Sequence, residues 1–165
     1  MHIVKEQLNG RVIQVADCGW DDVDHNKIFN KDNYDREFPF PIGIGQLSQY
    51  MYRIDDDLIN HYKKVLDLPM DCKWKGGGHE IKTGGFIESH IDKDYYGGLT
   101  IFLNQVWDIH DGGWGIAYDD ETNETIITVP KHNCGVFYHT PLYHCSYPVL
   151  KQDAVRRTIQ IFFYR

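Results

Sequence analysis

From Lys73 to Arg165 the sequence is a series of short β-type runs separated by Gly, Asp and Asn. Many short strands at close, regular spacing favour a sandwich, a jelly roll or a barrel. The chain of 165 residues suits a single domain, and strands from about residue 73 onward are expected to form its core. The runs are HEIKTGGFIESHID, GLTIFLNQVW, GWGIAY, TIITVP, CGVFYHT, HCSYPV and RTIQIFFY.

Residues 1–72 predict a hairpin, a loop and a helix that support this core. The runs HIVKEQL and RVIQVA flank an Asn-Gly pair, which supplies the positive φ angles of a type I′ hairpin turn. Residues 21–36 are polar without a sustained period, and the Pro/Gly-rich segment 38–45 predicts a loop, either a plain surface connection or a lid that contacts substrate. Residues 54–66 predict a helix, because their apolar side chains share one face, acidic residues occupy the first turn and a proline follows.

The charge of the chain restricts its partners. A formal net charge of −7 argues against broad binding of nucleic acid or an anionic membrane, because both require a basic face. No apolar run approaches the roughly 18 residues that cross a bilayer, and MHIVKEQLNG lacks the order of a signal peptide. We therefore expect a cytoplasmic protein without a nucleic-acid or membrane partner. Its 4 cysteines show no CxxC spacing, which predicts reduced thiols rather than a zinc site or a disulfide framework.

His90 and Asp92 stand two residues apart in a strand-like segment. Side chains at this spacing share one face of a strand, so an imidazole and a carboxylate would lie side by side. Their partner could be a metal ion, a proton relay or bulk water. Two histidines and one carboxylate on one side of an ion leave the opposite side open, which is the geometry of non-haem Fe(II) oxygenases. His139 and His144, which lie in or near later strand-like runs, are the candidates for the second histidine.

Alternation separates the two faces of the last strand. One face carries Ile159, Ile161 and Phe163, which suits packing under helices. The other face then points into the barrel with Arg156 and Thr158. A planar guanidinium there can hold a carboxylate through two parallel hydrogen bonds, a geometry that lysine cannot copy.

The order of these motifs resembles the 2-oxoglutarate/Fe(II)-dependent dioxygenase superfamily, in particular its prolyl-4-hydroxylase-like branch. HID is followed after about 50 residues by HCSYPV and then by RRT on the last strand. The residues around the HxD motif also resemble those of the family, in the segments GGFIESHID and IFLNQVWDIHDGGWGIAY. The likeness covers roughly the last 90 residues. It implies a mainly β chain with supporting helices, a double-stranded β-helix core, Fe(II) as metal and 2-oxoglutarate as cosubstrate.

The resemblance also implies a role for each motif residue. His90, Asp92 and His144 would hold the metal, with His139 as the competitor for the third position. In the family the first arginine of an Arg-Arg-Thr run is usually the cosubstrate ligand, which favours Arg156 over its neighbour. Thr158 would add a hydroxyl donor.

One family position is changed in this sequence. A tyrosine that touches 2-oxoglutarate often stands nine residues before the first histidine, and here that position is Ile81. Another hydroxyl would have to replace it, and Tyr138 and Thr100 are the candidates.

The activity implied is hydroxylation with O2 as oxidant, release of succinate and CO2, and ascorbate as a possible reductant. By analogy the substrate is a prolyl or other residue in a peptide or protein. A free amino acid or small metabolite is the alternative within the enzyme class. A cupin-like module that holds an ion without turnover, and a metal-free interaction protein, are the alternatives outside it.

Overall fold

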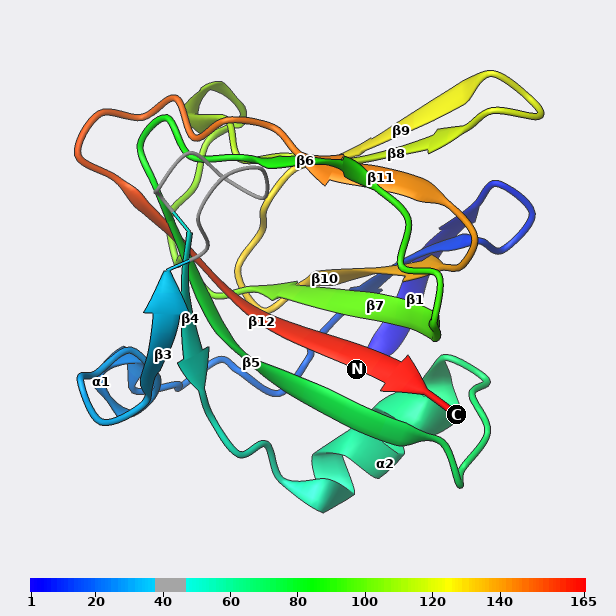
Figure 1. The fold of residues 1–165 in the computed structure, drawn as a ribbon, viewed down its shortest axis with the longest axis horizontal. Coiled ribbons are helices and arrows are strands. Elements are labelled where there is room, and N and C mark those ends of the chain that lie inside the picture. Colours follow the sequence, from blue (N-terminus) through cyan, green and yellow to red (C-terminus); the bar gives the residue numbers. More distant parts are fainter. Residues whose placement is uncertain (38–46) are drawn as a thin grey trace.

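The computed structural model describes residues 1–37 and 47–165. The predicted loop at 38–45 lies outside these residues. The described chain forms two antiparallel sheets that face each other (Figure 1). The larger sheet has the order β1-β2-β10-β7-β12-β5-β4-β3 and the smaller one β6-β11-β8-β9. Strand bounds are β1 His2–Gln7, β2 Val12–Ala16, β3 Tyr34–Glu37, β4 Leu47–Met51, β5 Lys73–Lys82, β6 Ile87–His90, β7 Tyr95–Phe102, β8 Gly115–Asp119, β9 Glu124–Thr128, β10 Gly135–His139, β11 Tyr143–Ser146 and β12 Val155–Tyr164.

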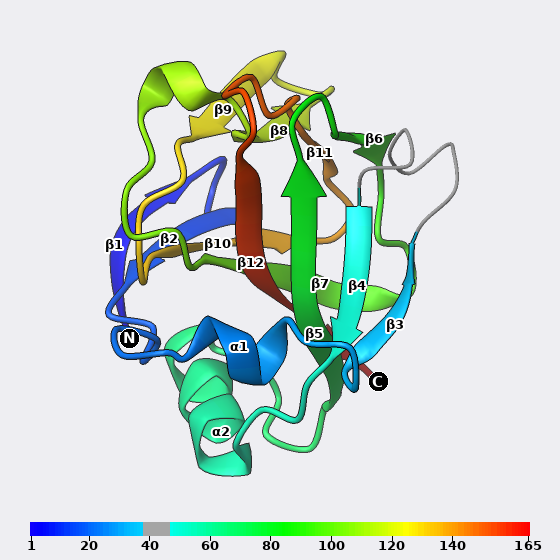
Figure 2. The same cartoon turned by 90° about the vertical axis from the view of Figure 1, so that its left-hand side faces the viewer.

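This arrangement confirms the predicted double-stranded β-helix in a mainly β chain. The helices are α1 His25–Ile28 and α2 Asp56–Val65, with a 3-10 turn η1 at Ile109–Asp111. Both helices lie on the side of the larger sheet that faces away from the smaller one (Figures 1 and 2). No helix among the described residues is long and apolar enough to cross a membrane.

The predicted N-terminal hairpin is confirmed, with its turn. Asn9 and Gly10 both have positive φ angles, 54° and 80°, and the Arg11 amide donates to the Leu8 carbonyl at 3.1 Å. These are the features of a type I′ turn, whose twist matches that of the flanking strands. The hairpin extends the larger sheet, because β2 pairs with β10.

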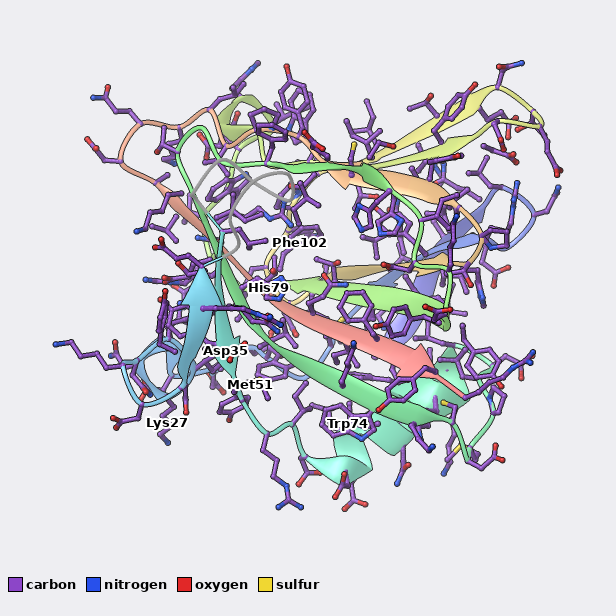
Figure 3. The ribbon with its side chains drawn as sticks, in the orientation of Figure 1. Lys27, Asp35, Met51, Trp74, His79 and Phe102 are labelled. Carbon is purple, nitrogen blue, oxygen red and sulfur yellow. The ribbon has the colours of Figure 1, made fainter. Side chains whose placement is uncertain are left out.

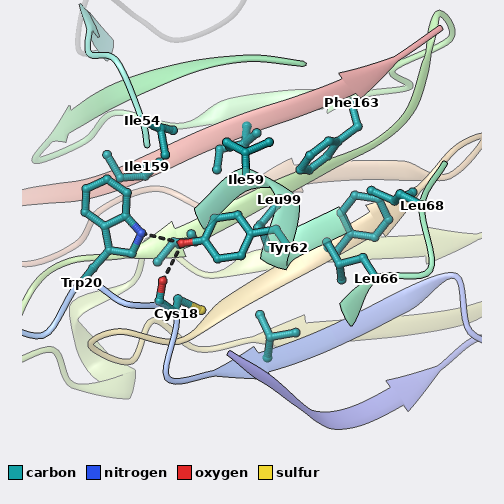
Figure 4. Packing of buried hydrophobic residues seen from close by; sticks show 14 of the residues in the cluster. Cys18, Trp20, Ile54, Ile59, Tyr62, Leu66, Leu68, Leu99, Ile159 and Phe163 are labelled. Carbon is teal, nitrogen blue, oxygen red and sulfur yellow. Dashed lines mark hydrogen bonds between the residues drawn. The ribbon is translucent and has the colours of Figure 1, made fainter. Parts of the chain in front are cut away.

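Helix α2, also predicted, covers the outer face of the larger sheet (Figure 4). Asp55 caps its start by accepting from the amides of Asp57 at 2.8 Å and Leu58 at 3.2 Å. Its buried Ile59 and Tyr62 pack in one cluster with the apolar face of β12. The cluster confirms that this strand turns its Ile159, Ile161 and Phe163 side toward the helices.

Two elements, α1 and β3, arise in or at the end of residues 21–36, where the sequence showed no regular pattern. Asp24 caps the single turn of α1 by accepting from the Asn26 amide at 3.0 Å. Strand β3 is exposed at every residue and pairs only with β4, at the edge of the larger sheet. A strand without a buried face has no alternation in its sequence, which is why periodicity missed it.

Candidate metal and cosubstrate site

A cavity of about 800 Å³ opens between the two sheets. Its walls come from both sheets, and they include Phe102 and His79 (Figure 3). Its outer part is bordered by side chains of β3, β4 and the start of β5, among them Asp35, Met51 and Trp74. All three predicted metal ligands lie on its wall.

His90, Asp92 and His144 converge from two strands of the smaller sheet. His90 ends β6 and stands directly opposite His144 of β11, and Asp92 follows two residues after the strand ends. The Nε2 atom of His144 lies 3.3 Å from Asp92 Oδ2, and that of His90 lies 3.7 Å from Asp92 Oδ1. One ligand atom of each residue falls within 4.8 Å of the others. The competitor, His139, instead packs its ring edge-on against Phe137.

Backbone carbonyls fix the orientation of both imidazoles. His90 Nδ1 lies 2.8 Å from the Glu88 carbonyl, and His144 Nδ1 lies 3.1 Å from the Leu142 carbonyl. A carbonyl can only accept, so Nδ1 carries the proton and Nε2 of the neutral ring keeps its lone pair. Both lone pairs therefore point toward the carboxylate of Asp92. Tyr138 supports the arrangement by stacking on His144, with ring centroids 5.0 Å apart.

This donor set fits a divalent metal. Asp92 Oδ2 is buried and has no hydrogen-bond partner among the described residues. A carboxylate oxygen facing imidazole lone pairs is unfavourable unless a cation lies between them. Burial, reinforced by the neighbouring His144, lowers the pKa of His90 and favours the neutral form that binds metals. Two imidazoles and one carboxylate on one side of an ion suit Fe(II) with open positions toward the cavity.

Arg156 lies buried on the cavity wall, as predicted, with 4% of its surface exposed. Its Nη1 donates to the Gly113 carbonyl at 2.7 Å and to the Ser146 hydroxyl, and its guanidinium lies 5.4 Å from the centroid of the Phe102 ring. Nε has no partner, and no carboxylate pairs with this side chain in the part of the chain that the structure describes. Burial lowers the pKa of Arg156 to about 10. A buried cation without a counter-ion is costly, so the site favours an anionic ligand.

The other predicted cosubstrate residues differ in their access to the cavity. Thr158 shares the inward face of β12 but is 2% exposed and is enclosed by its neighbours rather than on the cavity wall. Tyr138 lines the cavity, and its hydroxyl lies close to Thr128 of β9. Burial raises the pKa of Tyr138, so the hydroxyl stays protonated. Thr100 also lines the cavity, but its hydroxyl already donates to Gln160 Oε1 at 2.6 Å.

Sequence reasoning missed several residues of the cavity wall, above all His79 of β5 and Met51 of β4. Neither belongs to a motif. They reach the cavity because β5 pairs with β12 and β4 pairs with β5. Ile81, where the family often has tyrosine, packs in an apolar cluster with Leu47 and Val149. It offers no polar contact.

Comparison with known proteins supports the fold assignment. No family model and no curated protein matches the sequence. Among solved structures, a prolyl-4-hydroxylase from Pseudomonas putida is 16% identical with a TM-score of 0.66, over 82% of this chain and 78% of that one. A prolyl hydroxylase from Trichoplax adhaerens, solved with a peptide fragment of the hypoxia-inducible factor oxygen degradation domain, is 14% identical with a TM-score of 0.68, over 93% and 83%. A 2OG-Fe(II) oxygenase family protein from Burkholderia pseudomallei is 12% identical with a TM-score of 0.58, over 78% and 71%.

The fold and the cavity together define the class of architecture. The chain is a double-stranded β-helix with two histidines and an aspartate gathered at a cavity between its sheets. Its fold is that of the 2-oxoglutarate/Fe(II) oxygenases, and the similar structures include prolyl hydroxylases.

Proposed function

We propose that the protein is an Fe(II)- and 2-oxoglutarate-dependent dioxygenase that hydroxylates a prolyl or other residue of a peptide or protein. One observation carries this proposal. The His90, Asp92 and His144 cluster shares a cavity with Arg156, a buried guanidinium that lacks a carboxylate partner among the described residues. A metal-binding module without turnover would have no use for this cation, whereas 2-oxoglutarate requires both a metal and a cationic anchor.

Each group has a part in this function. His90, Asp92 and His144 would hold Fe(II), and Arg156 would bind the distal carboxylate of 2-oxoglutarate. When bound, Fe(II) and 2-oxoglutarate would supply the oxidising chemistry, in which 2-oxoglutarate and O2 become succinate and CO2 while one oxygen atom enters the substrate as a hydroxyl. Ascorbate would serve as reductant between turnovers.

The chain itself would position these components and exclude water. Tyr138 holds the ring of His144 by stacking on it and is itself part of the cavity wall. The buried Phe102 and Val136 line the cavity with apolar surface. Thr158, enclosed behind this wall, would support Arg156 on the same face of β12 rather than contact the cosubstrate freely.

A peptide or protein substrate fits the shape of the cavity. A five-carbon dicarboxylate fills only part of about 800 Å³, and the outer part is bordered by Met51, Trp74 and Phe162. Met51 is 58% exposed at this border. Exposed apolar side chains beside a reactive site suit an extended substrate, which continues past the cavity mouth. The peptide bound to the Trichoplax protein supports the same class of substrate.

The four cysteines of the chain are free thiols. Reduced cysteines agree with action in the cytoplasm, which we include in the proposal.

The test of the activity uses the purified protein with Fe(II), ascorbate and 2-oxoglutarate. The proposal predicts slow succinate release without substrate and faster release when a peptide substrate is found among a panel of peptides and free amino acids. It also predicts a rise in melting temperature when Mn(II) and 2-oxoglutarate are added together. Absence of both succinate and the thermal shift would favour a metal-binding module without turnover, and stimulation by a free amino acid alone would move the substrate to small metabolites.

A further inference from the structure

We propose that His79 binds the distal carboxylate of 2-oxoglutarate together with Arg156, in place of the tyrosine that the family often uses. The inference rests on the proposed function and adds a residue that no sequence motif marks.

The register of β5 and β12 brings the two residues together. Arg156 stands opposite Ile81, and Thr158 stands opposite His79, so His79 is the diagonal neighbour of Arg156 on the inward face. Diagonal neighbours on one face lie within reach of long side chains. His79 and Arg156 both line the cavity. Figure 3 shows the position of His79.

The position of His79 explains how a change at Ile81 can be tolerated. Ile81 and His79 are two residues apart on the same strand, so their side chains point to the same face. Ile81 is buried against Leu47 and Val149 and is 1% exposed, which removes it from the cavity. The next inward side chain along β5 is the imidazole of His79, which takes over the polar contact.

The chemistry of His79 suits a carboxylate ligand. Burial, and then the charge of Arg156, lower the pKa of His79 to about 4. The ring is therefore neutral near pH 7 and carries one N–H donor without adding a second positive charge. Glu80, the acidic residue next to it in the sequence, lies on the opposite face of β5, where it accepts from Arg157 and Tyr50.

Together these groups form an anion pocket with two kinds of donor. The Nε atom of Arg156 lacks a partner among the described residues, and the imidazole of His79 faces the same cavity. A carboxylate has two oxygens and accepts from several donors at once. It can therefore bind the guanidinium and the imidazole in one position.

The experiment measures binding rather than turnover. Isothermal titration calorimetry, with Mn(II) in place of Fe(II), compares wild type with His79→Ala and with the conservative His79→Gln. The ligands are 2-oxoglutarate and 2-oxopentanoate, which has the same five carbons but ends in a methyl group instead of the distal carboxylate. His132→Gln is the matched control, because His132 lies off the cavity wall near the Leu103 carbonyl.

We expect His79→Ala to weaken 2-oxoglutarate binding about 10-fold, with His79→Gln retaining part of the affinity through its amide N–H. Binding of Mn(II) and of 2-oxopentanoate should not change, and His132→Gln should match wild type. Unchanged 2-oxoglutarate affinity in both His79 variants would overturn the inference, and so would an equal loss for both ligands, since His79 would then only shape the cavity. Failure of the wild type itself to bind 2-oxoglutarate would instead overturn the proposed function.

Discussion

Arg156 and Arg157 are consecutive in the sequence, yet they lie on opposite faces of β12. Arg156 reaches into the cavity and donates to Gly113 and Ser146. Arg157 lies on the outer face, where its Nε donates to Glu80 Oε1 at 2.8 Å. One arginine therefore has its carboxylate within the chain, and the other is available for the carboxylate of a ligand.

This difference predicts that the same substitution has an effect at Arg156 and none at Arg157. Arg156→Lys keeps the charge but loses the paired N–H donors, so its affinity for 2-oxoglutarate should fall by about 2 kcal/mol, roughly 30-fold. Arg157→Lys is the control and should bind 2-oxoglutarate as wild type does. Titration calorimetry with Mn(II) measures both. Equal affinities in the two variants would contradict the assignment of Arg156.

The sequence predicted the faces of β12 correctly because alternation needs only neighbouring residues. The type I′ hairpin and α2 were predicted for the same reason, since turn residues and helical periodicity are local signals. Thr158 shows the limit of such reasoning. Alternation places it on the inward face, but its depth depends on strands from elsewhere in the chain, which enclose it.

Residues that reach the site through long-range pairing could not be predicted. His79 stands in the run GGGHEIK, which resembles no motif, and it joins the cavity because β5 pairs with β12, which begins at Val155. The three candidate metal ligands were predicted together because the HxD motif and the later histidine follow a known order, and the structure brings them close to one another. Even there, Asp92 proved to lie just beyond the end of β6 rather than within it.

Replacing the third metal ligand should abolish metal binding, whereas replacing its competitor should not. His144→Ala removes an imidazole whose Nε2 lies 3.3 Å from Asp92, and Mn(II) affinity should fall by more than about 100-fold, because losing a ligand costs more than losing a ligand's outer partner. His139→Ala should retain wild-type affinity, because His139 packs against Phe137 and is not part of the cavity wall. Calorimetric titration of Mn(II) decides between them, and equal losses would contradict the three-residue site.

Acid should destabilise the protein in part through His79. Its pKa is about 4 when folded and near 6.5 when unfolded, so between these values the unfolded chain binds the extra proton. The contribution of His79 to the free energy of unfolding is therefore fully present above pH 6.5 and is lost as the pH falls toward 4. At pH 5 the free energy of unfolding that is lost through His79 is on the order of 1 kcal/mol, allowing for its partial solvent access.

Urea unfolding of metal-free wild type and His79→Gln at pH 7 and pH 5 measures this loss of stability. The drop in free energy of unfolding between the two pH values should be smaller in the variant, although other histidines with lowered pKa, such as His25 and His139, keep it above zero. An identical drop in both proteins would contradict the prediction.

The core under α2 depends on one hydroxyl. Tyr62 donates to the Cys18 carbonyl at 2.5 Å and accepts from Trp20 Nε1 at 2.8 Å, and its side chain is fully buried (Figure 4). Tyr62→Phe leaves both partners buried without a hydrogen bond, which should cost about 1–3 kcal/mol. Tyr118→Phe is the control, because its hydroxyl bonds the exposed Asn123. Urea unfolding should show a lower midpoint for the first variant alone.

Met51 tests the proposed peptide substrate. It borders the outer cavity and is 58% exposed, so Met51→Ala should leave stability and 2-oxoglutarate binding unchanged. If substrate covers this side chain, its loss should raise the KM of a coupled peptide by about 10-fold, as expected for about 1–2 kcal/mol of apolar burial. Met70→Ala is a matched control, because Met70 is 47% exposed but lies away from the cavity wall. Since uncoupled succinate release does not involve the peptide, it should be equal in all three proteins. A KM that does not change in Met51→Ala would place the substrate elsewhere on the molecule.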